Sequence, residues 1–365
     1  MGGRAIRIAL IAPPFIPVPP IRYGGTELFV AGLAEGLMAL GHDVVVYANG
    51  ESEISAEVRW LYPKAQWPIT GEFSESLKEM THTAWATRDA ADSFDAIHVN
   101  NIYGLPYSGF VRVPVIHTIH HEHVEELSRF YSHYPDVQYV TISDFQRRQE
   151  LMPNIRTIHH GVEVSRYSFG RTKEPYLSFL GRIAPIKGTH LAVAAAKKSG
   201  IPLKIAGEIQ PMFRDYFDTE IKPHIDGKFI DYVGEADWAA KNELLSNSLA
   251  MLFPIQWNEP FGLVMIEAMA CGTPVLALPG GSVPEVVEDG ISGYVCGSVE
   301  QMAAYARDIE SLIRPDNVRR YAEEYFSTER MASQYARLYE SVADRSMIRS
   351  APELLEASGA EPAAA

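Results

Sequence analysis

The chain has 365 residues, of which 47% are hydrophobic and 21% charged, and its formal net charge at pH 7 is −14. This length allows two domains with sizeable cores. The acidic balance argues against nucleic acid as a partner and against strong binding to anionic membranes, because both attract basic proteins. Weak peripheral contact with a membrane and the oligomeric state stay open.

Targeting signals are weak in this sequence. No run of about 18 uncharged apolar residues occurs, so no membrane-spanning helix is predicted. The apolar start is short and is followed by prolines, which favours a first buried strand over a signal peptide. Cys271 and Cys296 are too few for a disulfide framework and sit in apolar segments, so we interpret them as small core residues. The sequence has no N-x-[ST] site, and we expect a cytoplasmic protein.

The first half of the chain alternates apolar runs with helical patterns. Residues 6–12 predict a strand, Gly24 and Gly25 a tight turn, residues 28–40 a helix with three- and four-residue apolar spacing, and 43–47 a parallel strand. Residues 51–80 are irregular and stay unassigned. The elements that follow are a helix at 77–91, strands at 96–99, 114–119 and 139–143, a helix at 145–151 and a strand at 156–160. We therefore predict a doubly wound α/β domain over residues 1–165.

The second half repeats this alternation and predicts a second Rossmann-like domain over residues 166–327. Its strands are expected at 176–180, 203–206, 229–233, 251–253, 275–277 and 293–295, and its helices at 189–198, 261–269, 283–287 and 302–325. A last amphipathic helix covers 328–345. Residues 346–365 are small and polar and predict a disordered tail.

The segment 253–274 carries the strongest chemical signal. Pro260 suits a first helical position, and Gly272 suits the end of the helix. The first helical turn has unpaired N–H groups and a positive dipole end, so an anion can bind at Gly262 and at the residue after it. An acidic residue stands on either side of this turn, and carboxylates bind hydroxyl groups. A sugar nucleotide has this layout, whereas the alternative is a core helix with one capping and one ion-paired glutamate.

Two other loops also suit phosphate. Arg182 and Lys187 are five residues apart on a loop after a strand, and a guanidinium fork with an ammonium group fits a diphosphate. Gly24 and Gly25 open a helix and form a second candidate cradle. The alternatives are two solvated cations and a plain tight turn. The G-x-G-x-x-G fingerprint of dinucleotide-binding domains is missing.

A histidine cluster raises the question of a metal site. His117, His120, His121 and His123 lie within seven residues. The sequence has no H-E-x-x-H, and histidines two and three residues apart at the end of a strand point in different directions. We therefore predict no metal site.

The string EPFGLVMIEAMACGTPV, residues 259–275, resembles the donor-site signature of the family 4 glycosyltransferases, which are retaining enzymes of the GT-B fold. GRIAPIKG, residues 181–188, is similar to the phosphate clamp of that family. PVIHTIHH, residues 114–121, is similar to the strand end that places a histidine near the donor sugar. The resemblance runs from the Gly24-Gly25 loop to about residue 296 and is weak over 51–110.

The resemblance implies roles for individual residues. Glu259 would bind donor-sugar hydroxyls, and Glu267 the ribose hydroxyls. His120, or alternatively His121, would lie near the transferred sugar. The diphosphate would be held by Arg182, Lys187 and the N–H groups of Gly262 and Leu263. The remaining donor-site positions that match the family are Gly24, Gly25, Glu208, Phe261 and the loop Gly280-Gly281-Ser282.

The resemblance also implies the arrangement of the molecule. Two Rossmann-like domains would face each other across a cleft, with the acceptor on the first domain and the helix 328–345 crossing back onto it. His160-Gly161-Val162 stands where the family more often has Asn-Gly-Val, and we expect this departure to affect the hinge between the domains. Glu285 is interpreted as an acid in the first turn of a helix, on its favourable dipole end.

The predicted function is retaining transfer of a sugar from a nucleoside-diphosphate sugar, such as a UDP- or GDP-sugar, to a glycan, lipid or small-molecule acceptor. No cofactor and no metal ion are expected, because two cations and a helix start neutralise the leaving diphosphate. The leaving phosphate would take the acceptor's proton during same-face attack. A nucleotide-sugar epimerase and a non-catalytic sugar-nucleotide binding module stay open as alternatives.

Overall fold

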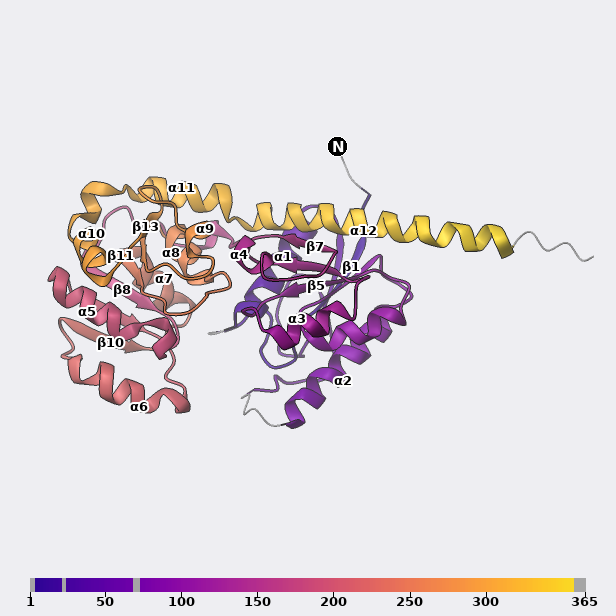
Figure 1. The fold of residues 1–365 in the computed structure, drawn as a ribbon, viewed down its shortest axis with the longest axis horizontal. Helices are drawn as coiled ribbons and strands as arrows, with labels where there is room; N and C mark the ends of the chain where they lie inside the picture. Colours follow the sequence, from indigo (N-terminus) through magenta and orange to yellow (C-terminus); the bar gives the residue numbers. More distant parts are fainter. Residues whose placement is uncertain (1–3, 22–23, 68–72, 358–365) are drawn as a thin grey trace, which may run out of the picture.

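The computed structural model describes residues 4–21, 24–67 and 73–357, with side chains described as far as Asp344. It contains two parallel sheets with helices packed around them, which lie side by side (Figure 1). The predicted fold class, two Rossmann-like doubly wound units of the GT-B type, is confirmed. The end of the predicted tail, 358–365, lies outside the described residues.

The first sheet has the strand order β3-β2-β1-β4-β5-β6-β7 in the described part of the chain, and its paired strands are parallel. Most of its strands are buried nearly throughout because helices cover both faces. Its strands are β1 (Arg7–Ile11), β2 (Asp43–Ala48), β3 (Glu57–Trp60), β4 (Ala96–Val99), β5 (Val115–Ile119), β6 (Gln138–Thr141) and β7 (Ile155–Thr157). Its helices are α1 (Gly25–Ala39), α2 (Phe73–Ala90), α3 (Glu125–Ser132) and α4 (Asp144–Arg147).

The second sheet has the order β10-β9-β8-β11-β12-β13 among the described residues. Its strands are β8 (Glu174–Leu180), β9 (Leu203–Ala206), β10 (Ile230–Gly234), β11 (Ser248–Phe253), β12 (Val275–Ala277) and β13 (Gly293–Val295). Its helices are α5 (Thr189–Ser199), α6 (Arg214–Tyr216), α7 (Trp238–Asn247), α8 (Leu263–Ala270), α9 (Val283–Val286), α10 (Val299–Leu312) and α11 (Pro315–Tyr325). In both sheets the strand order reverses beside the first strand, and ligands of open α/β sheets bind at such switch points.

The last helix, α12 (Thr328–Ala357), leaves the second domain and runs back along the first (Figure 1). It packs closely on α1, because a Cβ atom on Gly36 would stand only 2.5 Å from Ala332 Cβ. Its tyrosines also reach the first sheet. Tyr339 OH lies 2.7 Å from His98 Nδ1, and Tyr335 OH lies 2.8 Å from Thr118 Oγ1. The crossing helix therefore shares the core of the first domain.

Several predicted helix boundaries differ from the structure, and three of the differences have a clear physical reason. The helix of the donor segment begins at Leu263 rather than Pro260, because the left-handed backbone at Gly262 (φ 81°) cannot be part of a right-handed helix. The helix predicted over 302–325 is two helices, since Pro315 starts a new one. Residues 346–357, predicted as disordered, continue α12, and their Ala, Leu and Glu residues favour helix.

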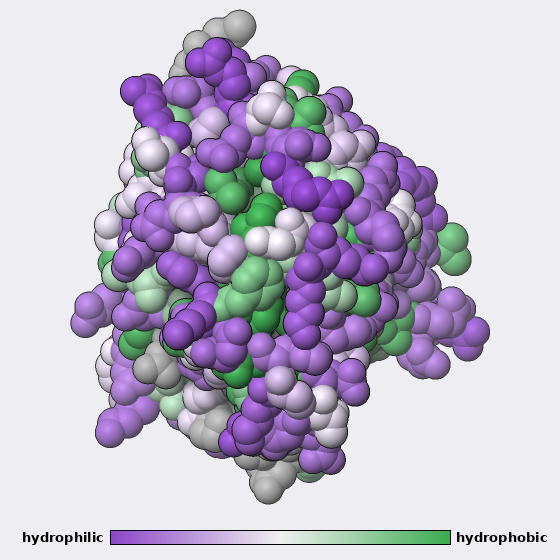
Figure 2. All heavy atoms as spheres, turned by 90° about the vertical axis from the view of Figure 1, so that its left-hand side faces the viewer, coloured by the Kyte–Doolittle hydropathy of each residue, from purple (hydrophilic) through white to green (hydrophobic). Residues whose placement is uncertain are grey.

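The exposed end of the second domain is mainly hydrophilic. Seen from the end of the second domain, hydrophilic side chains cover most of the surface and surround a narrow apolar strip (Figure 2). Within residues 4–21, 24–67 and 73–357, no helix is both long and apolar enough to cross a membrane.

Candidate active site

A cavity of about 730 Å³ lies between the two domains, at the carboxyl ends of β1, β8 and β9. Parallel strands end at one edge of a sheet, so loops that are far apart in the sequence meet there. Six of the predicted site residues line this cavity together, namely Gly24, Gly25, Arg182, Glu208, Leu263 and Glu267.

The start of α8 faces the glycine turn of the first domain. Gly262 is the N-cap residue and provides no side-chain cap, so the backbone N–H groups at the start of the helix have no side-chain partner there. A Cβ on Gly25 would stand 3.6 Å from Leu263 Cδ1, so the two predicted phosphate cradles lie opposite each other. An anion between them would be close to both backbones.

Arg182 follows β8 and projects from the loop into the same cavity. Its Nη1 donates to Gln210 Oε1 at 3.4 Å, and Gln210 Nε2 donates to Glu208 Oε2 at 3.3 Å. This chain of side chains orients the guanidinium group without neutralising it directly. Since Leu263 also lines the cavity, Arg182 lies on the same side of the molecule as the start of α8.

Lys187 and Glu259 form an ion pair beside this helix start. Lys187 Nζ lies 2.5 Å from Glu259 Oε2, and Trp257 Nε1 donates to the same oxygen at 2.8 Å. Glu259 is only 8% exposed, and a buried carboxylate requires such partners. Its Cγ lies 3.3 Å from where a Cβ on Gly262 would stand. The pair therefore adjoins the α8 start, although neither residue is among the described lining of the cavity.

Glu267 lies one helical turn into α8 and is buried. Tyr167 OH donates to its Oε1 at 2.9 Å, and Lys241 Nζ forms a short ion pair with the same oxygen. Lys241 belongs to α7, a helix that the sequence analysis did not predict, and it lines the cavity with Glu267. Both contacts hold the carboxylate at the cavity wall.

His120 directly follows β5 and is half-buried, and its Nε2 lies 2.9 Å from Asn100 Oδ1. Its ring stacks on His160 at 5.5 Å, and His160 in turn contacts Phe261 at 5.1 Å, one residue before Gly262. The departure from the family at His160 thus falls between the two domains. Burial, with the neighbouring histidines, lowers the pKa of His120 well below 6.5, so its imidazole is neutral at pH 7.

The other histidines of the predicted cluster face elsewhere. His121 Nε2 lies 2.5 Å from Tyr131 OH, and His123 Nδ1 lies 3.0 Å from Glu150 Oε1. His117 Nδ1 contacts the carbonyl oxygen of Val99 at 3.1 Å. Among the described residues, no three His, Cys, Asp or Glu side chains are grouped so that they could hold a metal ion.

Two family models match the chain in succession. Residues 23–166 match the model for Glycosyltransferase Family 4, and residues 163–328 match the model for Glycosyl transferases group 1. The chain belongs to the family 4 glycosyltransferases. This glycosyltransferase is 27% identical to the phosphatidyl-myo-inositol mannosyltransferase of Mycobacterium leprae over 93% of its own length and 97% of that protein.

Solved structures resemble this glycosyltransferase over nearly their whole length. AviGT4, a glycosyltransferase involved in avilamycin A biosynthesis, is 26% identical with a TM-score of 0.73, over 93% of this chain and 98% of AviGT4. HepE of Anabaena in complex with UDP-glucose is 18% identical with a TM-score of 0.71, over 92% of this chain and all of HepE. At 18% identity, the likeness to HepE shows the fold alone.

Sequence reasoning missed several partners in this glycosyltransferase. Trp257 stands two residues before Glu259 in the same turn, so its position in the motif was a usable signal. Lys241 and Tyr167 had no such signal in the sequence, because they approach Glu267 from other parts of the chain. Contacts of this kind depend on tertiary structure that no local pattern encodes.

A buried acid lies beside the glycine turn of this glycosyltransferase. Glu27 lies in the first turn of α1, and its Oε2 stands 2.9 Å from where a Cβ on Gly24 would be. Burial raises the pKa of Glu27 from 4.5 to about 7. Burial likewise raises the pKa of the nearby Glu79 to about 7.

The raised pKa of Glu27 predicts a loss of stability with rising pH. Because the folded value lies above the unfolded one, the contribution is complete below pH 4.5 and is lost as pH rises through about 7. Glutamine does not titrate, so its unfolding free energy lacks this loss. We expect the difference in unfolding free energy between Glu27→Gln and wild type to be up to about 3 kcal/mol larger at pH 8 than at pH 4. Urea unfolding at both pH values measures this. Glu35→Gln, at an exposed position on the same helix, is the control, and equal gains in both variants would contradict the prediction.

Proposed function

We propose that this glycosyltransferase takes its sugar from a nucleoside-diphosphate sugar and transfers it, with retention at the anomeric carbon and without a metal ion, to an acceptor hydroxyl held by the first domain. The observation that carries the proposal is the meeting of Arg182, the start of α8 and Glu267 in one cavity, opposite Gly24 and Gly25. A guanidinium group and helix N–H groups suit a diphosphate, and the carboxylate suits ribose hydroxyls.

Lys187 adds a second positive charge to the proposed diphosphate site. Its ammonium group has three donors and uses one of them on Glu259, so a phosphate oxygen can take another. Glu259 then remains fixed by Trp257 and accepts hydrogen bonds from the donor sugar. Positive groups already in place stabilise the charge that develops on the departing diphosphate. They supply the electrostatic stabilisation that a divalent cation provides in other sites.

The transfer step balances without a covalent intermediate. The bond between the anomeric carbon and the phosphate oxygen breaks, the acceptor oxygen bonds to that carbon on the same face, and the acceptor's proton passes to the leaving phosphate. His120 is neutral, and its Nε2 donates to the Asn100 amide oxygen, so its Nδ1 can accept a hydrogen bond from a hydroxyl group. Its role is therefore orientation of the reacting hydroxyl groups.

The acceptor side of the cavity is mainly apolar. The first domain contributes Phe15, Ile16, Pro17, Pro20 and Trp67 to the lining. Such a wall supports an acceptor with an apolar portion beside its hydroxyl group. HepE bound UDP-glucose on the same fold, which supports UDP-glucose as the first donor to test.

A donor panel tests the proposal. UDP-, GDP- and ADP-sugars are screened by thermal stabilisation of the protein, and the best donor is then incubated with and without acceptor alcohols in the presence of EDTA. We expect a product of unchanged anomeric configuration by NMR, and slow donor hydrolysis when acceptor is absent. An epimerised donor, an inverted product or activity abolished by EDTA would each contradict part of the proposal.

A further inference from the structure

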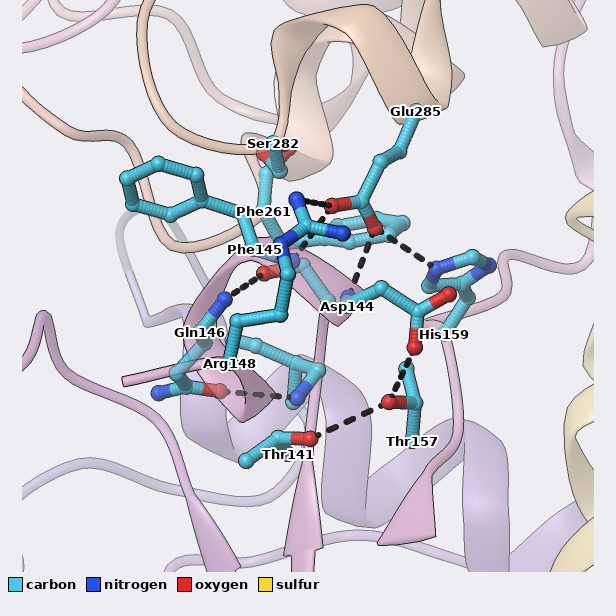
Figure 3. A network of polar contacts seen from close by, with 12 residues as sticks. Thr141, Asp144, Phe145, Gln146, Arg148, Thr157, His159, Phe261, Ser282 and Glu285 are labelled. Carbon is cyan, nitrogen blue, oxygen red and sulfur yellow. Dashed lines mark hydrogen bonds and ion pairs between the residues drawn. The ribbon is translucent and has the colours of Figure 1, made fainter. Parts of the chain in front are cut away.

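Glu285 of the second domain binds the backbone of the first. Its carboxylate accepts hydrogen bonds from Asp144 N at 2.7 Å and Phe145 N at 2.5 Å, the first two residues of α4 (Figure 3). His159 Nε2 lies 3.3 Å and Arg148 Nη2 3.7 Å from the same group. Glu285 is in the first turn of α9, as predicted, but its partners lie more than 120 residues away in the other domain.

On the second domain, this contact leads directly to the donor segment. Glu285 N donates to the Ser282 carbonyl oxygen at 2.8 Å. Ser282 N donates to the Glu259 carbonyl oxygen at 2.9 Å, and Ser282 Oγ donates to the Phe261 carbonyl oxygen at 2.9 Å. The backbone on both sides of Pro260 is therefore fixed to the same short turn that carries Glu285.

On the first domain, the contact leads to the end of β5, where His120 follows the strand. Gln146 of α4 donates through Nε2 to the carbonyl oxygens of Ile119 at 3.1 Å and His121 at 2.6 Å, the two residues that flank His120. Its Oε1 accepts from Ile142 N at 2.9 Å, so the whole side chain is fixed. The start of α4 and the backbone around His120 thus form one hydrogen-bonded unit.

We propose that Glu285 is a positioning residue that fixes the acceptor-side His120 relative to the donor-side Glu259 across the domain boundary. The path is continuous: donor segment, Ser282, Glu285, the N–H groups of α4, Gln146, and the carbonyl oxygens beside His120. A displacement of about 1 Å between reacting groups can slow catalysis by about 10²-fold. This inference goes beyond the proposed function and rests on the roles proposed there for His120 and Glu259.

Glu285→Gln removes the charge and presents an amide N–H₂ group to one of the two N–H donors. We expect kcat to fall by about 10- to 100-fold, with the donor KM within threefold, because most of the proposed donor contacts lie on the second domain. Glu288→Gln is the matched control, since it makes the same charge change three residues away at an exposed position. A kcat within threefold of wild type, or a donor KM that changes as much as kcat, would overturn the proposal.

A second variant acts on the other partner and needs no change at Glu285. Asp144→Pro deletes one N–H donor at the first position of α4, where proline fits, and the extended backbone of Ser143 (φ −151°, ψ 157°) suits a residue before proline. Asp144→Ala loses the same carboxylate, which accepts from Thr157 Oγ1 at 2.5 Å, but keeps the N–H group. We expect kcat to fall further in the proline variant, and non-additively with Glu285→Gln. Equal kcat values in the two Asp144 variants would overturn the proposal.

A distance measurement tests the interdomain contact of Glu285 with α4 independently of activity. Spin labels at Arg112→Cys and Lys228→Cys, both at exposed positions, report the separation of the two domains, while the native cysteines are buried. We expect Glu285→Gln to broaden the distance distribution and Glu288→Gln to leave it unchanged. Identical distance distributions in wild type and Glu285→Gln would overturn the proposal that Glu285 positions the two domains. Failure of the donor panel with wild type would overturn the proposed function alone.

Discussion

Replacing Lys187 by methionine is expected to lower kcat by about 10²- to 10³-fold, the effect of removing one preorganised electrostatic group from an active site. Methionine keeps an apolar stem over the Trp257 ring, which the ammonium group approaches to 4.6 Å, and removes the charge together with its N–H donors. Steady-state transfer measured with the best donor gives the ratio. Lys228→Met, at an exposed position, is the control, and we expect it to match wild type.

The same substitution leaves Glu259 as a buried carboxylate with Trp257 as its remaining side-chain partner. We therefore expect Lys187→Met to lower the unfolding free energy as well as kcat. Breaking a buried pair costs about 3–5 kcal/mol. The double variant Lys187→Met, Glu259→Gln removes that charge, and we expect it to recover most of the unfolding free energy without recovering turnover. A double variant that regains activity would show that Lys187 acts only by stabilising Glu259.

The donor segment shows how far the sequence alone could lead. The motif at 259–275 predicted a helix start with an acid on each side, and the structure has α8 with Glu259 before it and Glu267 inside it. The exact start was wrong, because the motif contains both Pro260 and Gly262 and either suits a helix N-terminus. Gly262 has a left-handed backbone that separates it from the helix, and a Cβ there would stand only 2.7 Å from Met265 Cε. Composition alone does not reveal this crowding.

Interdomain contacts were beyond sequence reasoning for a physical reason. The pattern around Glu285 indicated a helix N-terminus correctly, yet the carboxylate serves a second helix 140 residues earlier in the chain. His160 looked like a hinge residue, and its ring lies between His120 and Phe261. Periodicity and turn chemistry report on neighbours within a few residues, whereas these partners are chosen by how the two domains meet.

Phe29 is where the crossing helix, the first sheet and the candidate catalytic histidine meet. Its ring is 2% exposed and lies 4.9 Å from the rings of both His120 and His160 and 5.6 Å from that of Tyr335 on α12. The edge-to-face contacts with His120 and Tyr335 are the geometry that aromatic pairs prefer. Loss of this ring would therefore weaken the docking of α12 and free the ring of His120 at the same time.

We expect Phe29→Ala to lower the unfolding free energy by about 3–5 kcal/mol, the range for deletion of a buried phenylalanine ring. Urea unfolding measures it, and Phe110→Ala, at a side chain that is 87% exposed, should stay within about 0.5 kcal/mol of wild type. Phe29→Leu keeps more of the volume but no ring, so we expect a smaller loss of stability together with a lower kcat. If Phe29→Leu retained full kcat, the ring would serve only the core, and His120 would be held by Asn100 and His160 alone.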